Sequence, residues 1–177
     1  MSRVEQVVLV DENDKVLGIE DKMRAHELAL LHRAFSVFVY RKNNGFIEIL
    51  LQQRHRDKYH CGGLWTNTCC SHPRLGEEII EAAERRLKEE MGIQAILTPC
   101  GIFQYTATFN NGLTENEIDH VFLGWFDGTP FTTNLSEISE WMWISHDELQ
   151  KNILLTPDRY TPWLRPALEK LLPQLLR

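Results

Sequence analysis

The stretch from Arg54 to Pro73 holds the residue types that most readily do chemistry. It is rich in cysteine, histidine, glycine and threonine, and it has no clear hydrophobic period. A connection of this length is unusual in a compact domain unless it serves a function, so we predict a functional loop. Cys69 and Cys70 are adjacent, an awkward arrangement for a disulfide framework. No signal peptide is visible, so we expect free thiols, and both a reactive cysteine and a buried inert one remain open.

Basic residues begin the same loop. Arg54, Arg56 and Lys58 lie within five positions, which permits a local anion site. The whole chain of 177 residues has a net charge of −6, whereas broad nucleic-acid binding needs a basic face. No apolar run approaches the roughly 20 residues that span a bilayer. We therefore expect a cytoplasmic protein that binds neither nucleic acid nor membrane, and that remains free to bind a small anion.

The segment from Glu77 to Met91 is the clearest predicted helix. Ile80, Ala83 and Leu87 belong to one apolar stripe at helical spacing, and Gly92 ends the helix. The opposite side of this helix is charged.

The remaining elements are predicted mainly as strands. Alternating or β-branched segments that predict strands are Val4–Val10, Val16–Ile19, Arg33–Tyr40, Phe46–Gln53, Gly101–Phe109, His120–Phe126 and Glu140–Ile144. Residues 110–119 are predicted as a polar connection and 21–31 as helical or irregular. Ser145 is expected to cap a short helix, and a proline-punctuated helix is expected from Asp158 to Leu176. No repeat or linker is visible, so one mixed α/β domain is predicted.

The carboxyl end of the 77–91 helix carries a motif. Glu89 and Glu90, followed after one residue by Gly92 and an apolar residue, resemble the end of the Nudix box. In that family the glutamates hold a divalent metal against a diphosphate. Glu77 and Arg85 also fall on positions of the pattern.

Two residues depart from the Nudix box. Ser71 stands where the box begins with glycine, and Arg86 stands where a key metal-binding glutamate follows the arginine. Replacing a carboxylate with a guanidinium removes a metal ligand and adds a group that binds diphosphate. The departure favours retention of an intact diphosphate over its hydrolysis. The helix alone is equally open to interpretation as a surface helix with ordinary charge pairs.

The loop before the helix narrows the resemblance. Residues 65–73, Trp-Thr-Asn-Thr-Cys-Cys-Ser-His-Pro, are similar to the cysteine motif of type 1 isopentenyl-diphosphate isomerases. Further family motifs occur in the family's order at 24–26, 31–36 and 115–117, and the resemblance runs from about Val10 to Trp163. It implies an α/β (α+β) fold in which a Nudix-like mixed β-sheet is sandwiched between helices. We expect a single domain over residues 1–177 with a Nudix-like core at about 31–165.

The activity that the resemblance implies is the interconversion of isopentenyl diphosphate and dimethylallyl diphosphate in isoprenoid biosynthesis. An alkene is a poor base, so moving its double bond needs a well-placed acid and tolerance of a tertiary carbocation. The family implies that Cys70 and Glu117 lie on opposite faces of the isoprenoid and exchange proton roles. It further implies that Tyr105 relays the proton to this glutamate and that the π face of Trp163 stabilises the cation. Relatives with one cysteine before x-His-Pro have it at the position of Cys70.

The resemblance also implies a metal centre. Its ligands would be His26, His32, His72, Glu115 and Glu117, a mixture that suits Mn²⁺, Fe²⁺ or Zn²⁺ better than an all-oxygen Mg²⁺ site. If the segment around the two glutamates is extended, both carboxylates lie on one side. The six-residue interval between the first two histidines requires a bend in the backbone. The other histidines, which we expect to be solvated or hydrogen-bonded bystanders, are His55, His60, His120 and His146.

A second ion, Mg²⁺, is expected with the diphosphate of the substrate. Glu90 matches the family carboxylate that binds this ion. Lys22, Arg54, Lys58 and Arg86 match the basic positions that grip the diphosphate. Together they suit an anion of high negative charge.

Three other interpretations remain at this point. A zinc knuckle could use Cys61, Cys69, Cys70 and His72, although structural zinc usually takes pairs separated by two or more residues. A Nudix-type diphosphate hydrolase is the alternative enzyme, and Arg86 counts against it. A catalytically idle binding protein would be expected to have lost some of the motif residues. No dinucleotide-binding glycine motif calls for flavin, and the chain is expected to be a monomer or homodimer.

Overall fold

The computed structural model describes residues 5–175. The strands are β1 (Gln6–Val10), β2 (Val16–Asp21), β3 (His32–Asn43), β4 (Phe46–Arg54), β5 (Trp65–Thr66), β6 (Cys69–Ser71), β7 (Leu97–Thr108), β8 (Thr114–Trp125) and β9 (Ile138–Ser145). The helices are α1 (Lys22–Glu27), α2 (Ile79–Met91), α3 (His146–Leu155) and α4 (Leu164–Leu175), with a 3-10 turn at Pro157–Arg159.

Strand β3 is the centre of one mixed sheet. It runs parallel to β8, from His32 beside Glu117 to Tyr40 beside Trp125. Along its other edge it pairs in turn with β1, β6 and β4, all antiparallel. β7 extends the sheet beyond β8, and β9 pairs with β4. Three strands from distant parts of the chain, β1, β6 and β8, therefore meet at the amino-terminal half of β3.

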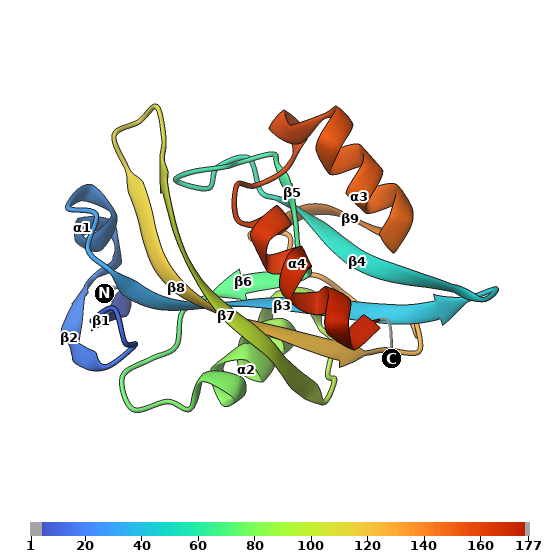
Figure 1. Cartoon of the computed structure of the whole chain (residues 1–177), viewed down its shortest axis with the longest axis horizontal. Coiled ribbons are helices and arrows are strands. Elements are labelled where there is room, and N and C mark those ends of the chain that lie inside the picture. The colour runs from blue at the N-terminus through green and yellow to red at the C-terminus, as the bar shows by residue number, and fades with distance from the viewer. Residues whose placement is uncertain (1–4, 176–177) are drawn as a thin grey trace.

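Helices cover both faces of the sheet (Figure 1). On one face α2 places Leu87 and Met91 against Val37 and its neighbours on β3, β4 and β8. On the other face α3 and α4 pack against Phe38 and the alternate residues of the same strands. The alternation of β3 side chains thus supplies two separate cores. A mixed β-sheet sandwiched between helices is confirmed.

Several local predictions are confirmed. The helix predicted from Glu77 begins at Ile79 and ends at Gly92, which has a φ of 68°. Ser145 caps α3 by accepting a hydrogen bond from the backbone N–H of Glu148. Asn44 and Gly45, both with positive φ, form the turn between β3 and β4. The strand predicted from Val4 is β1, which begins at Gln6. Val4 itself lies outside the described residues.

Two predicted elements begin six residues away from where the structure places them. Residues 110–119 were expected to form a polar connection, but β8 already begins at Thr114. Glu115, Glu117 and Asp119 stand at alternate positions and face a pocket instead of solvent, so the segment has strand geometry although most of its residues are polar. The helix expected from Asp158 begins only at Leu164, because the chain first makes a 3-10 turn and is then extended at Tyr160, where it pairs with Trp65. Leu176, its expected end, lies outside the described residues.

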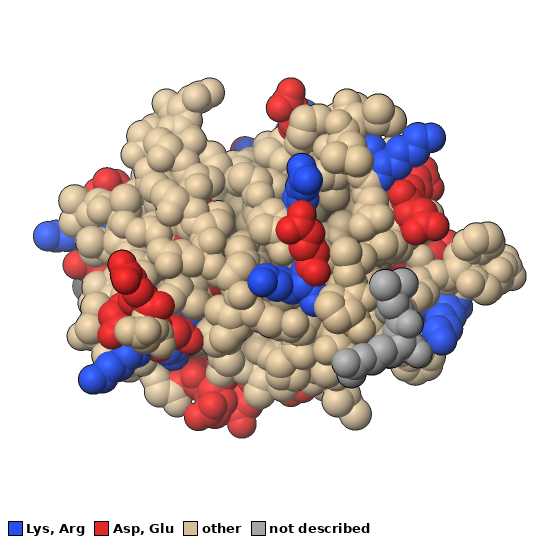
Figure 2. All heavy atoms as spheres, viewed as in Figure 1, with Lys and Arg blue, Asp and Glu red and all other residues tan. Residues whose placement is uncertain are grey.

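Charged side chains are interspersed on the face drawn in Figure 2. Lysine and arginine lie among acidic and uncharged residues there and form no continuous basic area on that face. Within residues 5–175, none of the helices has the length and apolar character that a membrane span requires.

Gly92 is expected to be a costly position to substitute. A Cβ there would lie 2.5 Å from the carbonyl oxygen of Thr132, in the segment that packs on the end of α2. Gly45 has a similar positive φ of 84° but open space around it. We expect Gly45→Ala to cost about 1 kcal/mol, the usual penalty of a left-handed residue, and Gly92→Ala to cost about 1–3 kcal/mol more. Urea unfolding of both variants measures the difference, and equal losses would contradict the close approach.

Candidate functional site

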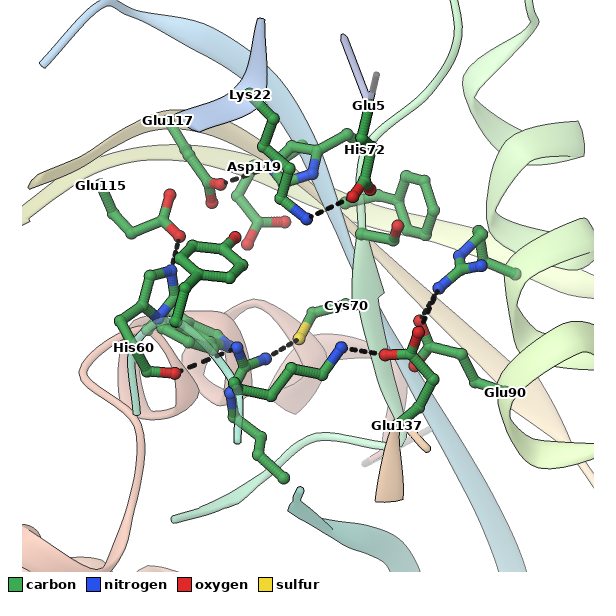
Figure 3. A pocket seen from close by; sticks show the side chains of 18 of the residues that line it. Glu5, Lys22, His60, Cys70, His72, Glu90, Glu115, Glu117, Asp119 and Glu137 are labelled. Atoms are coloured by element: carbon green, nitrogen blue, oxygen red, sulfur yellow. Dashed lines mark hydrogen bonds and ion pairs between the residues drawn. The ribbon is translucent and has the colours of Figure 1, made fainter. Parts of the chain in front are cut away.

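The residues predicted to act together line one pocket above the amino-terminal half of β3 (Figure 3). The predicted residues that line it are Lys22, Arg54, Lys58, Cys70, His72, Arg86, Glu90, Tyr105, Glu115, Glu117 and Trp163. His26 and His32 are fully buried against the two carboxylates of β8. Every predicted site residue is therefore in or directly against this pocket.

Five of these side chains form a compact group that could hold a metal ion. The nitrogen and oxygen atoms that His26, His32, His72, Glu115 and Glu117 offer all lie within 4.8 Å of one another. The parallel register of β3 and β8 places His32 directly beside Glu117. Alternation along β8 turns both glutamates to the same side, as the sequence suggested.

Backbone carbonyls set the orientation of two of these imidazoles. The Nδ1 of His26 contacts the carbonyl of Lys22, and the Nδ1 of His32 lies 2.8 Å from that of Leu30. A carbonyl can only accept, so each Nδ1 carries a proton and each Nε2 faces the carboxylates. Metal-binding histidines usually have this second hydrogen bond. The bend required between them is present at Ala29, whose φ is 52°.

The donor set fits a divalent cation. The Nε2 of His26 lies 3.0 Å from Oε2 of Glu115, yet both atoms are buried and neither has a hydrogen-bond partner. Buried polar atoms are normally stabilised by hydrogen bonds, which these two atoms lack. A cation between them would satisfy both. The second glutamate offers Oε1 to the Nε2 of His72 at 2.9 Å and of His32 at 3.2 Å.

The charges of the group also favour a cation. Burial alone would raise the pKa of Glu115, but the imidazoles of His26, His32 and His60 beside its carboxylate hold that pKa well below its ordinary value. Burial and the neighbouring carboxylate would raise the pKa of Glu117, but its histidine partners lower it. Two buried ionised carboxylates remain, and a positive charge must compensate them.

Glu117 connects the metal-binding group to the rest of the pocket. Its second oxygen, Oε2, accepts a hydrogen bond of 2.6 Å from the hydroxyl of Tyr105. Burial and the carboxylate raise the pKa of this tyrosine well above its ordinary value, so it keeps its proton and donates. The carboxylate is thus held from two sides.

The two adjacent cysteines lie in different surroundings. Cys69 is fully buried in the core beneath α2, whereas Cys70 lines the pocket. Arg54 lies beside the pocket cysteine, with a guanidinium nitrogen 3.7 Å from its sulfur. Burial raises the pKa of the Cys70 thiol to about 12 despite this arginine. Cys70 is therefore a neutral thiol in the pocket.

Trp163 forms part of the pocket wall. Its indole N–H donates to Oδ1 of Asn67 at 3.2 Å, which fixes the ring. The guanidinium carbon of Arg54 lies 5.4 Å from the ring centroid, and the ring of Tyr105 lies 6.1 Å away. The ring is thus within reach of a cation in this pocket.

The zinc-knuckle interpretation is wrong. Among the described residues, the group of side chains placed to hold a metal contains no cysteine. Cys69 faces the core while Cys70 faces the pocket, so the adjacent sulfurs point to opposite sides of β6. All four cysteines are free.

The pocket lining includes residues that were not predicted as part of the site, among them Asp119 and His60, and the expectation that His60 is a bystander is wrong. His60 is buried, hydrogen-bonds through Nε2 to Oε1 of Glu115, and stacks on Phe109 at 4.6 Å. Asp119 continues the inward alternation of β8 and accepts a hydrogen bond of 2.7 Å from Ser36. The alternation could have indicated the aspartate. The available signal that His60 belongs to the site was its place in the 54–73 loop.

Known proteins resemble this chain over most of its length. A family model for the NUDIX domain matches residues 30–170. An isopentenyl-diphosphate Delta-isomerase from Pectobacterium atrosepticum is 46% identical over 90% of this chain and 87% of its own length. Isomerase 2 of Aromatoleum aromaticum is 45% identical over 95% of this chain and 87% of its own, and the Photobacterium profundum isomerase is 44% identical over 97% and 96%.

The chain belongs to the isopentenyl-diphosphate Delta-isomerase family. Solved structures with lower identity share its NUDIX fold. A protein from Deinococcus radiodurans has a TM-score of 0.68 at 18% identity and covers 86% of this chain and 90% of its own. A MutT protein from Methanosarcina mazei has a TM-score of 0.65 at 19% identity, covering 83% and 96%.

In this member of the isomerase family, Arg86 contacts acidic residues of its own helix. Its guanidinium donates to Glu89 at 2.7 Å and also pairs with Glu90. Its side chain therefore spans from the exposed side of α2 to the buried carboxylate that lines the pocket. The departure from the Nudix box noted in the sequence thus lies in the pocket itself.

The five-residue group is expected to bind a divalent metal. Replacing His32 with alanine removes one nitrogen and breaks the contacts with both glutamates, so affinity for Mn²⁺ or Zn²⁺ should fall at least about tenfold. His146→Ala, at the first residue of α3, serves as the control and should leave affinity unchanged. Metal titration followed by calorimetry measures both, and equal affinities in the two variants would contradict the site.

His60 is expected to support the same group through Glu115. His60→Ala removes the contact that orients this carboxylate, so metal affinity should fall about tenfold. His60→Gln retains a side-chain N–H donor and should recover part of the loss. If the two variants bind metal as tightly as the parent protein, the histidine has only a packing role.

Proposed function

We propose that this chain interconverts isopentenyl diphosphate and dimethylallyl diphosphate, with Cys70 and Glu117 as the two groups that exchange protons with the substrate. The observation that carries the proposal is that a neutral thiol and a carboxylate belonging to a metal-binding group line the same pocket. The pocket also contains an aromatic ring and several cations. An unreactive alkene bearing a diphosphate needs this combination.

The reaction is a balanced transfer of protons. One group donates a proton to the terminal carbon of the alkene, which leaves a tertiary cation at the branched carbon. The other removes a proton from the carbon next to the one that bears the diphosphate, and that C–H electron pair forms the new double bond. Cys70 and Glu117 exchange these roles between the two directions. Tyr105 donates to the carboxylate and relays the proton at its Oε2.

Trp163 stabilises the positive charge between the two proton transfers. Its fixed ring lies within reach of the guanidinium of Arg54, so the pocket already places a cation beside this wall. A cation–π contact is worth on the order of 2 kcal/mol or more when desolvated. Burial of the ring excludes water that would otherwise capture the cation.

His26, His32, His72, Glu115 and Glu117 would hold Mn²⁺ or Zn²⁺. When bound, this ion would fix the orientation of Glu117 and tune its acidity. Glu90 would hold Mg²⁺ that accompanies the substrate diphosphate. The protein would work with these ions as a monomer or homodimer.

Basic residues hold the diphosphate without cleaving it. Lys22, Arg54, Lys58 and Arg86 come from separate elements and line the same pocket. Arg86 occupies a position where a carboxylate would complete the metal set of a hydrolase, and it supplies a diphosphate contact instead. This substitution disfavours the hydrolase alternative.

The thiol of Cys70 is expected to be essential for catalysis. Cys70→Ala removes one of the two proton-exchanging groups, so the turnover of isopentenyl diphosphate should fall by about 10²–10⁴-fold. Cys69→Ala is the matched control because that thiol is buried in the core outside the pocket, and most of the activity should remain. Product formation measured by chromatography distinguishes the variants. Full activity in Cys70→Ala would contradict the mechanism.

A further inference from the structure

Most of the cations proposed to grip the diphosphate are already paired with carboxylates. The pairs are Lys22 with Glu5, Lys58 with Glu137, and Arg86 with Glu90. Arg54 alone among the four has no such partner within the described residues. Figure 3 shows Glu137 and Glu90 beside the nitrogen atoms of their partners. A diphosphate that enters the pocket must therefore compete with the protein's own carboxylates.

Glu137 stands out among these carboxylates because it serves two cations. It pairs with Lys58, and its other oxygen lies 3.9 Å from a guanidinium nitrogen of Arg86. Burial would raise the pKa of Glu137, but Lys58 and then Arg86 lower it, so it is ionised. By contrast, the side chain of Glu5, the partner of Lys22, is 62% exposed.

The backbone holds Glu137 in this place. Its carbonyl accepts a hydrogen bond of 2.9 Å from the N–H of His55, at the start of the loop that carries Lys58. Three residues earlier in the same segment, the N–H of Asn134 donates to the carbonyl of Glu90 at 2.8 Å. The segment is thus tied both to the functional loop and to the end of α2. Its carboxylate cannot leave the cations by a large movement of the chain without breaking these bonds.

We propose that Glu137 is a specificity-determining residue that occupies Lys58 and Arg86 and yields them only to a diphosphate accompanied by a divalent cation. The inference rests on the proposed function, because it assumes that these cations hold the substrate. An anion alone must separate the ion pairs and then lie beside a free carboxylate, which repels it.

A divalent cation reverses this effect. Once Lys58 and Arg86 contact phosphate oxygens, Glu137 and Glu90 have lost their partners and together place two negative charges beside the diphosphate. A cation that arrives with the diphosphate is attracted by both the carboxylates and the phosphate oxygens. The binding of diphosphate and of the cation is then mutually favourable, and each strengthens the other by the same factor.

The same carboxylate discriminates against simpler anions. A single phosphate carries less charge and offers fewer oxygens than a diphosphate, so it competes less well for cations that are already paired. Four free basic residues in one pocket would attract many anions. Glu137 therefore restricts the pocket to the ligand that its cations and the metal ion can hold together.

The test compares the parent protein with Glu137→Gln and with Glu140→Gln, an exposed carboxylate on β9 that serves as the matched control. Inorganic pyrophosphate and inorganic phosphate are titrated by calorimetry, each with and without Mg²⁺. Without Mg²⁺, Glu137→Gln should bind pyrophosphate about fivefold more tightly, the size expected for removal of a partly exposed ion pair. Its phosphate affinity should also rise, and its gain from added Mg²⁺ should shrink by a similar factor. Glu140→Gln should match the parent protein.

The outcomes separate the inference from the function it rests on. If the parent protein binds pyrophosphate with Mg²⁺ but Glu137→Gln shows unchanged or weaker Mg²⁺-free binding, the role of this residue is overturned and the proposed function stands. If the parent protein binds no pyrophosphate even with Mg²⁺, the proposed diphosphate site is overturned as well. Thermal melting of each variant confirms that it is folded.

Discussion

Two ionised carboxylates, Glu115 and Glu117, are buried on the same side of strand β8. The rest of the site compensates the free-energy cost of burying these two charges. Alternation along the strand turns both to the same side, where their charges repel each other. Burial of charge without compensation is strongly unfavourable. The chain brings imidazoles from α1, from the start of β3 and from the end of β6 to these two residues. The positions of α1 and of the loop after β4 therefore serve to neutralise these two carboxylates.

The same constraint connects the metal-binding group to the chemistry. One oxygen of Glu117 faces histidines, while the other accepts the hydroxyl of Tyr105 in the pocket. Cys70 reaches the pocket because β6 is a short strand paired with β3, so alternation directs it away from the core that takes Cys69. The alternation of side chains along β8 and β6 thus places the carboxylate of Glu117 and the thiol of Cys70 in one pocket.

The sequence predicted the site better than it predicted element boundaries. Short motifs around His32, Cys70 and Glu117 have specific residue types at fixed spacing, and the structure brings all of them together. The start of β8 was missed because Glu115 and Glu117 made a buried strand look like a polar loop. The hydrophobic pattern could not distinguish a strand that faces a polar pocket from one that faces water.

Other contacts could not be predicted because they join residues far apart in the chain. His60 meets Glu115 and Lys58 meets Glu137 across 55 and 79 residues, and neither pair leaves a local pattern. A single histidine or glutamate in a loop is usually solvated. Only the pairing of β3 with β8 and the segment before β9 brings these partners together.

Proton and phosphorus NMR of the metal-loaded protein with isopentenyl diphosphate in D₂O would test most directly whether this pocket exchanges protons with an intact diphosphate. We expect dimethylallyl diphosphate to appear with deuterium incorporated, while both phosphorus signals of the diphosphate persist. Release of inorganic phosphate, or an unchanged spectrum with both metal sites filled, would contradict the proton-exchange mechanism.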